Sequence, residues 1–345
     1  MAPRPVFFEH PSSIEHDTGD HPEQAARLVV IKRELERRAW LGWERVRSPR
    51  VDLEVLTAVH SPAFVAAIER VTEAGGGALD SDTVVSSGSF EAALRGSGGA
   101  VAMVERLLAS GAGARGFSAH RPPGHHASRA RAMGFCLFNH IAVAARWALD
   151  VAGLERVMVL DWDVHHGNGT SDIFWESAEV LLVSIHQWPL YPGSGRADEV
   201  GTGAGRGYTV NLPVPAATGD DVYVSLVRDV VAPLARRFAP ELVLVSAGFD
   251  AHVEDPLASC AVTEAGFAAM AALMGEVSDE LGVPLGCVLE GGYALGALAR
   301  SVVAVMETLG GGLADAAAPG AAFGEPVALA RDALVRLAEF WPGLG

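Results

Sequence analysis

Four short apolar runs, each followed by polar or glycine residues, constrain the fold of this chain most strongly. They are Arg156–Leu160, Val180–Ile185, Leu242–Val245 and Leu285–Leu289. Continuous apolar runs of this length are typical of parallel strands that are buried on both faces. Segments with helical spacing lie between them, as the crossover connections of a parallel sheet require, for example Asp220–Phe238 and Thr263–Leu281. The sequence therefore predicts an α/β fold in which helices flank a central, mainly parallel sheet.

The chain has 345 residues, of which 50% are hydrophobic, so it can bury a large core. Strand-like and helical segments alternate from about Val101 to Val303 without a Pro/Ser-rich linker, which favours one domain over residues 1–345. Three further helices are expected at Pro22–Arg38, Ser61–Glu73 and Ser89–Leu108. From Gly310 to Pro326 the Gly- and Ala-rich composition predicts a loose connector, followed by an amphipathic helix over Val327–Trp341.

Charge and cysteine content exclude several classes of protein. The net charge of −16 disfavours nucleic acid as a partner, and its simplest meaning is solubility. Three scattered cysteines do not form a disulfide framework, which favours a reducing compartment. Residues Met1–His10 lack the regions of a signal peptide, and no apolar run is long enough for a membrane span. We expect a cytoplasmic protein with no membrane or nucleic-acid partner, and the sequence leaves a homo-oligomer open.

A metal site is predicted at the end of the apolar run Arg156–Leu160. Alternate side chains of an extended segment share a face, so Asp161, Asp163 and His165 can project together. Carboxylates this close in a desolvated cleft are costly unless a divalent cation compensates their charge. Asp250, at the end of the run that starts at Leu242, is the leading candidate for a third ligand.

Asp163, His165 and Asp250 would leave an open fourth position for water, as in a catalytic zinc site. An oxygen-rich ligand set also admits iron(II), cobalt or manganese. The alternative is an ordinary polar turn after a buried strand, but that alternative leaves Asp250 and a second histidine pair unexplained.

That second pair is His125-His126, which follows the stiff segment Pro122-Pro123-Gly124. Since neither ring is needed as a ligand, we expect the pair to move protons, from water and then to an amine leaving group. Tyr293 follows Glu290-Gly291-Gly292, and its phenol could donate a hydrogen bond to a developing oxyanion. Taken singly, each of these side chains would more often have a structural role.

These residues and motifs resemble the zinc-dependent histone deacetylase and acetylpolyamine amidohydrolase family, whose fold is arginase-like. The resemblance covers His21 to about Gly311. Its motifs are Arg121–His126, Gly134-Phe135-Cys136, Asp161–Gly169, Ala247–Asp250, Asp255-Pro256-Leu257 and Glu290–Tyr293. Asn168 in His-His-Gly-Asn-Gly is similar to the class II branch of the family.

The resemblance implies a role for each matched residue. Asp163, His165 and Asp250 would bind one zinc ion per chain, and His126 would be the principal general base and acid. His125 would be its electrostatic partner, oriented by Asp161, and Tyr293 would polarise the amide carbonyl. A structural potassium ion is implied near Asp161, Asp163, His165 and Ser184. An acyl-lysine tunnel would be walled by Phe135 with Gly134 and by Tyr191, and Asp82 stands where some members bind the substrate backbone.

Two departures from the family pattern bear on substrate and catalysis. Asn168 stands where class I members have Asp, so His126 lacks an ionised partner there, as in class II enzymes. Leu257 occupies a rim position where polyamine-selective members can carry an acidic residue, and an apolar side chain provides no anchor for a cation.

The sequence therefore predicts zinc-dependent hydrolysis of an N-acyl amide, most plausibly deacetylation of acetyl-lysine in a protein or peptide. Hydrolysis of an acetylpolyamine or another small amide is the alternative on the same site. A rival enzyme would use Cys136 as a nucleophile together with His125 or His126. Outside the enzyme class, the chain could be a module that binds acyl-lysine without cleaving it.

Overall fold

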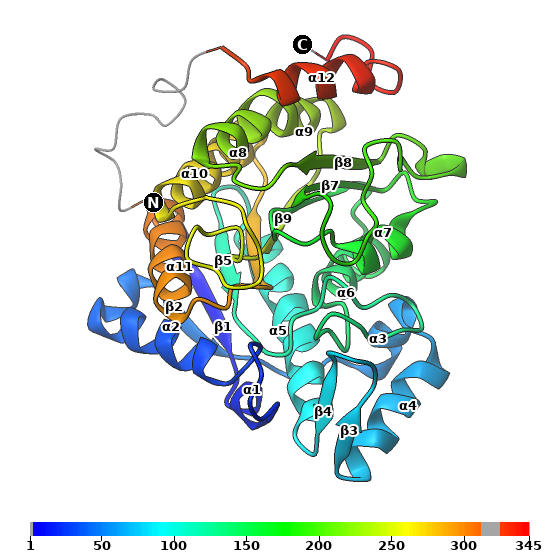
Figure 1. The fold of residues 1–345 in the computed structure, drawn as a ribbon, viewed down its shortest axis with the longest axis vertical. Coiled ribbons are helices and arrows are strands. Elements are labelled where there is room, and N and C mark those ends of the chain that lie inside the picture. The colour runs from blue at the N-terminus through cyan, green and yellow to red at the C-terminus, as the bar shows by residue number, and fades with distance from the viewer. Residues whose placement is uncertain (1–2, 312–324, 345) are drawn as a thin grey trace.

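The computed structural model describes residues 3–311 and 325–344. Its centre is an 8-stranded sheet in the order β2-β1-β5-β10-β9-β6-β7-β8, and every pairing among these strands is parallel. The strands are β1 Val6–Glu9, β2 Glu44–Arg47, β5 Arg115–Ser118, β6 Val157–Asp161, β7 Val180–Gln187, β8 Thr209–Val214, β9 Leu242–Ala247 and β10 Leu285–Leu289. A small antiparallel hairpin, β3 Gly76–Ala78 and β4 Val84–Ser86, lies apart from the sheet (Figure 1). The predicted central parallel sheet is confirmed.

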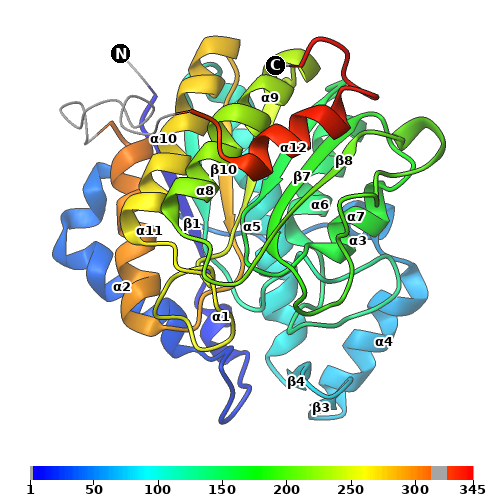
Figure 2. The same cartoon turned by 45° about the horizontal axis from the view of Figure 1, so that its top comes forward.

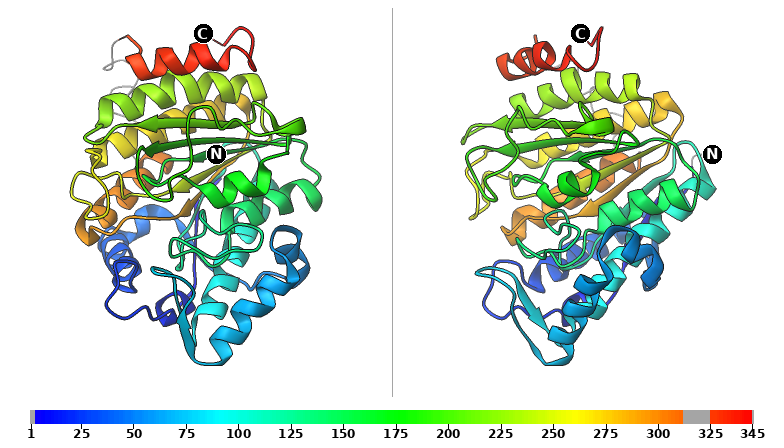
Figure 3. Two further views of the ribbon diagram at one scale, coloured as in Figure 1. Left: turned by 45° about the vertical axis from the view of Figure 1, so that its right-hand side comes forward. Right: turned by 90° about the vertical axis from the view of Figure 1, so that its right-hand side faces the viewer.

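Helices cover both faces of this sheet (Figures 1 and 3). They are α1 Ser12–Glu15, α2 Ala26–Arg37, α3 Leu53–Val59, α4 Pro62–Glu73, α5 Ser89–Ser110, α6 His140–Asp150, α7 Asn168–Phe174, α8 Asp220–Leu226, α9 Ala232–Phe238, α10 Glu264–Leu281, α11 Leu295–Leu309 and α12 Ala328–Leu337. Successive residues of one strand enter opposite cores. Met158 and Leu160 belong to one core, and Val157 and Val159 belong to the other. Burial on both faces is the reason that these strands are continuously apolar.

Local signals set several helix ends. Ser61 caps α4 by accepting a hydrogen bond from the N–H of Phe64 at 3.3 Å, and Pro62 occupies the first turn. Asn139 caps α6 in the same way, through the N–H of Ala142 at 3.0 Å. Helix α10 ends at Gly282, whose φ of 70° is the left-handed conformation that glycine tolerates.

Two predicted helices have other bounds in the structure, and a third contains a π-helical segment. Helix α2 begins at Ala26 rather than Pro22, because His21 and Glu23 form a turn in which the N–H of Glu23 donates to Nδ1 of His21 at 3.0 Å. The segment with helical spacing over Asp220–Phe238 is helical with those bounds, and its middle, Val227–Val231, is a π-helix between α8 and α9. The last helix spans only Ala328–Leu337 of the predicted Val327–Trp341. Most of the predicted connector, residues 312–324, lies outside the described residues.

Helix α12 packs beside α8 near the β8 edge of the sheet (Figure 2). After this helix, Trp341 donates from Nε1 to the carbonyl of Gly207 at 2.9 Å, and its ring lies 5.3 Å from that of Tyr208. The tail is therefore bound to the body of the molecule. In the described part of the chain, no helix is both long and apolar enough to cross a bilayer, and a cytoplasmic location stays a prediction.

Because the sheet is parallel, the segments that follow its strands meet along one edge. Segments 119–128, 162–169, 248–256 and 290–294 follow β5, β6, β9 and β10, which are neighbours in the sheet. These four segments carry half of the predicted site residues, namely His125, His126, Asp163, His165, Asn168, Asp250 and Tyr293. Asp161 and Ser184 lie in strands β6 and β7, and Leu257 immediately follows the third segment. Asp82, Gly134, Phe135 and Tyr191 lie on other loops.

Candidate active site

Three side chains converge as a candidate metal centre. Ligand atoms of Asp163, His165 and Asp250 all lie within 4.8 Å of one another. Nδ1 of His165 is 3.2 Å from Oδ1 of Asp163 and 3.1 Å from Oδ2 of Asp250. All three residues are buried, and strands β6 and β9, which precede them, pair directly. Two carboxylates and one imidazole are a donor set that suits zinc and related divalent cations, so these residues fit a metal ion.

The electrostatics of this cluster favour a cation. Burial alone would raise the pKa of Asp163, yet His125 and His165 hold that pKa well below its ordinary value. Burial would lower the pKa of His165, but its bonds to Asp163 and Asp250 raise it to about 10. Burial and the charge of Asp163 raise the pKa of Asp250. A divalent ion that replaced the proton of His165 would compensate the charge of both carboxylates.

Backbone groups fix the two carboxylates. The N–H of Gly291 donates to Oδ2 of Asp163 at 2.8 Å, and the N–H of Val164 donates to Oδ1 of Asp250 at 2.9 Å. A Cβ at Gly291 would lie 2.0 Å from Oδ2 of Asp250, and one at Gly248 would lie 2.1 Å from Oδ2 of Asp163. Both positions require glycine because the carboxylates approach the backbone closely.

The histidine pair lies beside this centre, with ring centroids 4.0 Å apart. Nδ1 of His125 bonds to Oδ2 of Asp161 at 3.0 Å, and Nδ1 of His126 bonds to Oδ1 of Asn168 at 2.7 Å. The amide nitrogen of Asn168 donates to the sulfur of Met133 at 3.4 Å, which leaves its oxygen facing His126. His126 therefore carries its proton on Nδ1, and Nε2 remains free to accept one.

The two histidines differ in charge. Burial and the neighbouring His125 and His165 lower the pKa of His126 well below its ordinary value. Burial acts in the same direction on His125, but the carboxylates of Asp163 and Asp161 raise its pKa well above the ordinary value. A neutral imidazole thus lies next to a cationic one, and only the neutral ring can act as a base.

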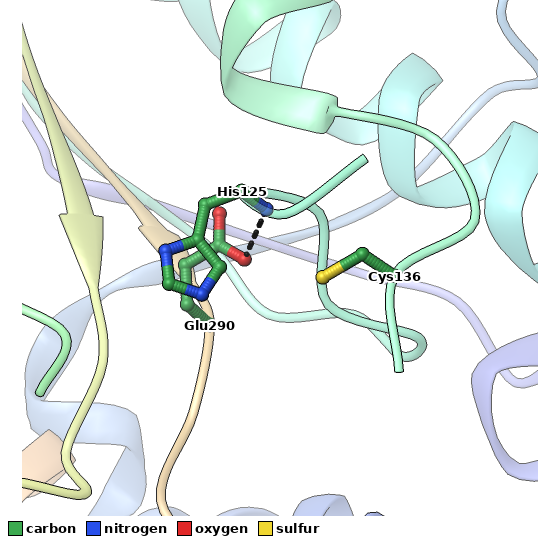
Figure 4. A group of neighbouring side chains, drawn as sticks. All are labelled: His125, Cys136 and Glu290. Atoms are coloured by element: carbon green, nitrogen blue, oxygen red, sulfur yellow. Dashed lines mark hydrogen bonds between the residues drawn. The ribbon is translucent and has the colours of Figure 1, made fainter. Parts of the chain in front are cut away.

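Glu290 binds the backbone at the start of the histidine pair. Its Oε2 accepts hydrogen bonds from the N–H of Gly124 at 2.6 Å and of His125 at 3.0 Å, and Figure 4 shows its carboxylate alongside the His125 ring. Together with Cys136 these two residues form a second group of potential metal ligands within 4.8 Å. However, burial and the charge of Glu290 raise the pKa of the Cys136 thiol well above its ordinary value. A neutral thiol is a poor ligand and a poor nucleophile, which disfavours a cysteine mechanism.

Tyr293 is held at the end of the β10 segment. Its ring lies 4.9 Å from the guanidinium carbon of Arg27 and 5.6 Å, edge to face, from the ring of Phe135. Arg27 is fully buried and donates to the carbonyls of Gly292, at 2.7 Å, and of Glu290. The half-buried ring of Tyr293 thus lies against Arg27, which binds the turn between β10 and Tyr293.

Residues 21–309 match the family model described as the histone deacetylase domain. The chain belongs to the histone deacetylase family. It is 37% identical over 310 residues to a probable deacetylase of Archaeoglobus fulgidus, which covers 88% of this chain and 85% of that protein. It is 39% identical over 308 residues to a histone deacetylase-like amidohydrolase of Pseudomonas aeruginosa, with coverage of 88% and 80%. The crystal structure of the HDA15 HD domain matches with a TM-score of 0.89 at 34% identity, over 99% of this chain and 96% of that one.

These matches confirm the predicted deacetylase-like α/β fold. They also make the chain a hydrolase, because its relatives in the family are deacetylases and amidohydrolases. An acylated substrate follows from membership of the histone deacetylase family.

Two of the predicted substrate-binding residues of this deacetylase domain, Tyr191 and Gly134, lie beside His126. The ring of Tyr191 lies 5.2 Å from that of His126, and a Cβ at Gly134 would lie 2.4 Å from Cδ2 of His126. Phe135 has its ring 4.6 Å from that of His21, whose Nε2 bonds to the carbonyl of Asp82 at 3.1 Å. The structure thereby joins Asp82 to the predicted tunnel walls.

Two further predicted residues, Leu257 and Ser184, reach the site through a neighbouring residue. Leu257 is half-buried, and its N–H donates to Oδ1 of Asp255 at 3.0 Å. Ser184 is the register partner of Asp161 across β6 and β7, and its Oγ bonds to Nδ1 of His186 at 2.9 Å.

Sequence reasoning assigned no role to Arg27, Glu290 or Asp255, although the latter two belong to quoted motifs. Arg27 binds a carbonyl 265 positions away, a contact that no local pattern predicts. Glu290 and Asp255 left a signal in the sequence, because each is an acidic residue beside Gly or Pro after an apolar run. Such residues often accept hydrogen bonds from nearby backbone N–H groups.

Proposed function

We propose that this protein is a zinc-dependent deacetylase that hydrolyses acetyl-lysine in a protein or peptide. The observation that carries the proposal is the convergence of Asp163, His165 and Asp250 next to the free Nε2 of a neutral His126. Membership of the histone deacetylase family supports the same activity.

A bound zinc ion would supply Lewis acidity, which lowers the pKa of water and polarises the acyl carbonyl. Nε2 of His126 takes the proton of the attacking water and later delivers it to the departing amine. His125, bound to Asp161, contributes a positive charge beside the developing oxyanion. Tyr293 donates its phenol proton in a hydrogen bond to the carbonyl oxygen, and Phe135 and Tyr191 wall the acyl chain.

Substrate choice rests on the rim. Leu257 and the rings of Phe135 and Tyr191 present apolar surface, which favours the aliphatic stem of an acyl-lysine. A second candidate is hydrolysis of an acetylpolyamine, because Asp82 and Asp80 lie close enough to Tyr191 for their charges to act with burial in raising the pKa of its phenol. Those carboxylates could attract a cationic amine.

A substrate panel tests the proposal. The metal-free protein is reloaded separately with zinc, iron(II), cobalt and manganese, and turnover is measured on an acetyl-lysine peptide, acetylputrescine and acetylspermidine. We expect metal-dependent turnover that is fastest on the peptide, with acetate released. Faster turnover of the polyamines would favour the second candidate. Retention of an intact acetyl-lysine peptide by the loaded protein would instead support a non-cleaving binding module.

Two variants test the assigned roles. His126→Ala and Tyr293→Phe should lower kcat by about 100-fold or more, since each removes a group that acts in the transition state. Tyr208→Phe is the matched control, because its ring packs against Phe238 and Trp341 away from the site. Turnover like wild type in both active-site variants would refute the mechanism.

We also propose a structural potassium ion beside Asp161 and Ser184, with Asp163 and His165 completing the site. The register pairing of Asp161 with Ser184 supports it, since it places oxygen atoms of two strands together. Replacing K⁺ with Na⁺ should lower the melting temperature, and equal melting in both salts would contradict the proposal.

A further inference from the structure

We propose that Asp255 is a positioning residue for Tyr293, and that its carboxylate links Tyr293 to the rim residue Leu257. The inference rests on the proposed hydrolysis, in which the Tyr293 phenol binds the carbonyl oxygen. It adds to that function a connection between the surface where substrate arrives and the group that stabilises its reaction.

Asp255 makes three hydrogen bonds to backbone groups of two separate loops. Its Oδ2 accepts from the N–H of Tyr293 at 2.7 Å and from that of Ala294 at 3.2 Å. Its Oδ1 accepts from the N–H of Leu257 at 3.0 Å. The residue is 7% exposed, so water does not readily replace these bonds.

Apart from Asp255, Arg27 holds the backbone of this segment on the N-terminal side of Tyr293. Arg27 binds the carbonyls of Glu290 and Gly292, which fixes the chain up to the residue before Tyr293. Asp255 binds the next two N–H groups, just before α11 begins at Leu295. Without this carboxylate, two part-buried donors lose their acceptor and the backbone at Tyr293 loses one of its restraints. A displacement of about 1 Å is enough to weaken a hydrogen bond aimed at a transition state.

The other oxygen of the same carboxylate binds Leu257, the residue that the family resemblance places at the rim. Asp255-Pro256-Leu257 forms a turn that the side chain of Asp255 closes onto the N–H of Leu257. The loop is pinned at its base, where Val253 donates to the carbonyl of Val262 at 2.9 Å and Val262 donates to that of Ala251 at 3.0 Å. Val253 is 57% exposed on this loop. A substrate that presses on the loop therefore acts on the carboxylate that also holds Tyr293.

Asp220 provides a matched comparison. Its carboxylate accepts from the N–H and the Oγ1 of Thr263, at 2.7 Å and 2.6 Å, just before α10 begins. Like Asp255, it is an aspartate that accepts a backbone N–H of the segment between β9 and α10, at the end of that segment next to α10. It does not bind the Tyr293 segment.

The test is a double-mutant cycle on the zinc-loaded full chain. Asp255→Asn keeps the shape but turns one acceptor into an NH₂ group, which must face a backbone donor. We expect kcat for an acetyl-lysine peptide to fall about tenfold, with KM changed less than about threefold and zinc content unchanged. In the Tyr293→Phe background the same substitution should lower kcat less than about twofold, since the two residues act as one unit. Asp220→Asn should leave kcat within about twofold of wild type.

Three results would overturn the inference. The first is a loss of kcat from Asp255→Asn that is as large in the Tyr293→Phe background as in the wild type. The second is loss of zinc from the Asp255→Asn variant. The third is a loss of kcat in Asp220→Asn as large as that in Asp255→Asn. An inactive wild-type protein would contradict the proposed function itself, which separates the two failures. If Asp255→Asn does not fold, Asp255→Ser, which keeps one small acceptor, takes its place in the same cycle and is judged by the same outcomes.

Discussion

At the scale of single residues, the site is built by carboxylates that accept backbone N–H groups. Asp163, Asp250, Asp255 and Glu290 each bind main-chain donors of another segment. Such bonds are directional, so they fix where each oxygen points and not only that it is buried. A metal site that depends on this geometry is sensitive to small changes in the backbone around it.

Gly291→Ala should lower metal affinity by about tenfold or more. The new Cβ would meet Oδ2 of Asp250 at 2.0 Å and Oδ2 of Asp163 at 2.5 Å, so both ligands must move. Zinc affinity by competition with a chelator measures the effect. Gly275→Ala is the control, because its Cβ would meet its nearest atom at 3.6 Å within α10. Equal affinities of the two variants would contradict the close approach.

Glu290→Ala should destabilise the protein by about 2–4 kcal/mol, because it leaves the buried N–H groups of Gly124 and His125 without their acceptor. Glu290→Gln keeps an oxygen for those donors and should cost less. Denaturant unfolding of the zinc-loaded forms gives both values. The prediction fails if the two variants are equally stable.

At the scale of elements, the sequence predicted four neighbouring strands of the sheet and their functional edge, but not the other four strands. Strands β6, β7, β9 and β10 are buried on both faces, and burial is what a continuous apolar run records. Strand β5 was missed because it begins with Arg115, whose buried guanidinium binds Ser278 and the carbonyl of Gly275. Strand β8 contains Asn211 and Pro213, and β2, at the sheet edge, has Val46 as its single apolar residue.

The site was predictable to a similar degree. The chemical types and spacing of Asp163, His165 and Asp250 pointed to a shared metal before their positions were known. The roles of Arg27 and Asp255 depend on contacts between distant segments, which only the tertiary structure provides.

The segment that carries His125 and His126 is supported by two other buried histidines. His60 bonds to the carbonyl of Ser128 and His140 bonds to that of Pro122. Burial lowers the pKa of each to about 4. In the unfolded chain these imidazoles take up a proton near pH 6.5, whereas in the folded chain they do so only near pH 4. The folded state is therefore favoured most above pH 6.5, and its stability falls as the pH is lowered from 6.5 to 4.

We therefore expect the free energy of unfolding to decrease from pH 6.5 to 4, by at most about 3 kcal/mol for each of the two histidines. His60→Gln should flatten this dependence, because it removes one of the two buried imidazoles. Unfolding measured across this pH range checks the prediction. A profile unchanged by His60→Gln would count against it.

At the scale of the whole molecule, the C-terminal helix braces the sheet far from the chemistry. Trp341 is 8% exposed and its ring lies 5.3 Å from Tyr208 and 6.3 Å from Phe238. The contact joins the end of the chain to the β8 side of the sheet, whereas the candidate active site lies at the ends of β5, β6, β9 and β10.

Trp341→Ala should lower stability by about 3–5 kcal/mol and leave the kcat of the folded protein unchanged. Val335→Ala, at a position that is 79% exposed, should change stability by less than about 0.5 kcal/mol. Denaturant unfolding and turnover below the transition separate the two effects. A loss of kcat in the folded Trp341 variant would show that the tail reaches the site.

The proposed metal ligands come from segments that are remote in the chain, since His165 and Asp250 are separated by 85 positions. An ion that requires both at once cannot be captured by a nascent or half-assembled sheet. Binding of the metal would therefore require that β6 and β9 have already paired. A bound ion would then stabilise that pairing against unfolding.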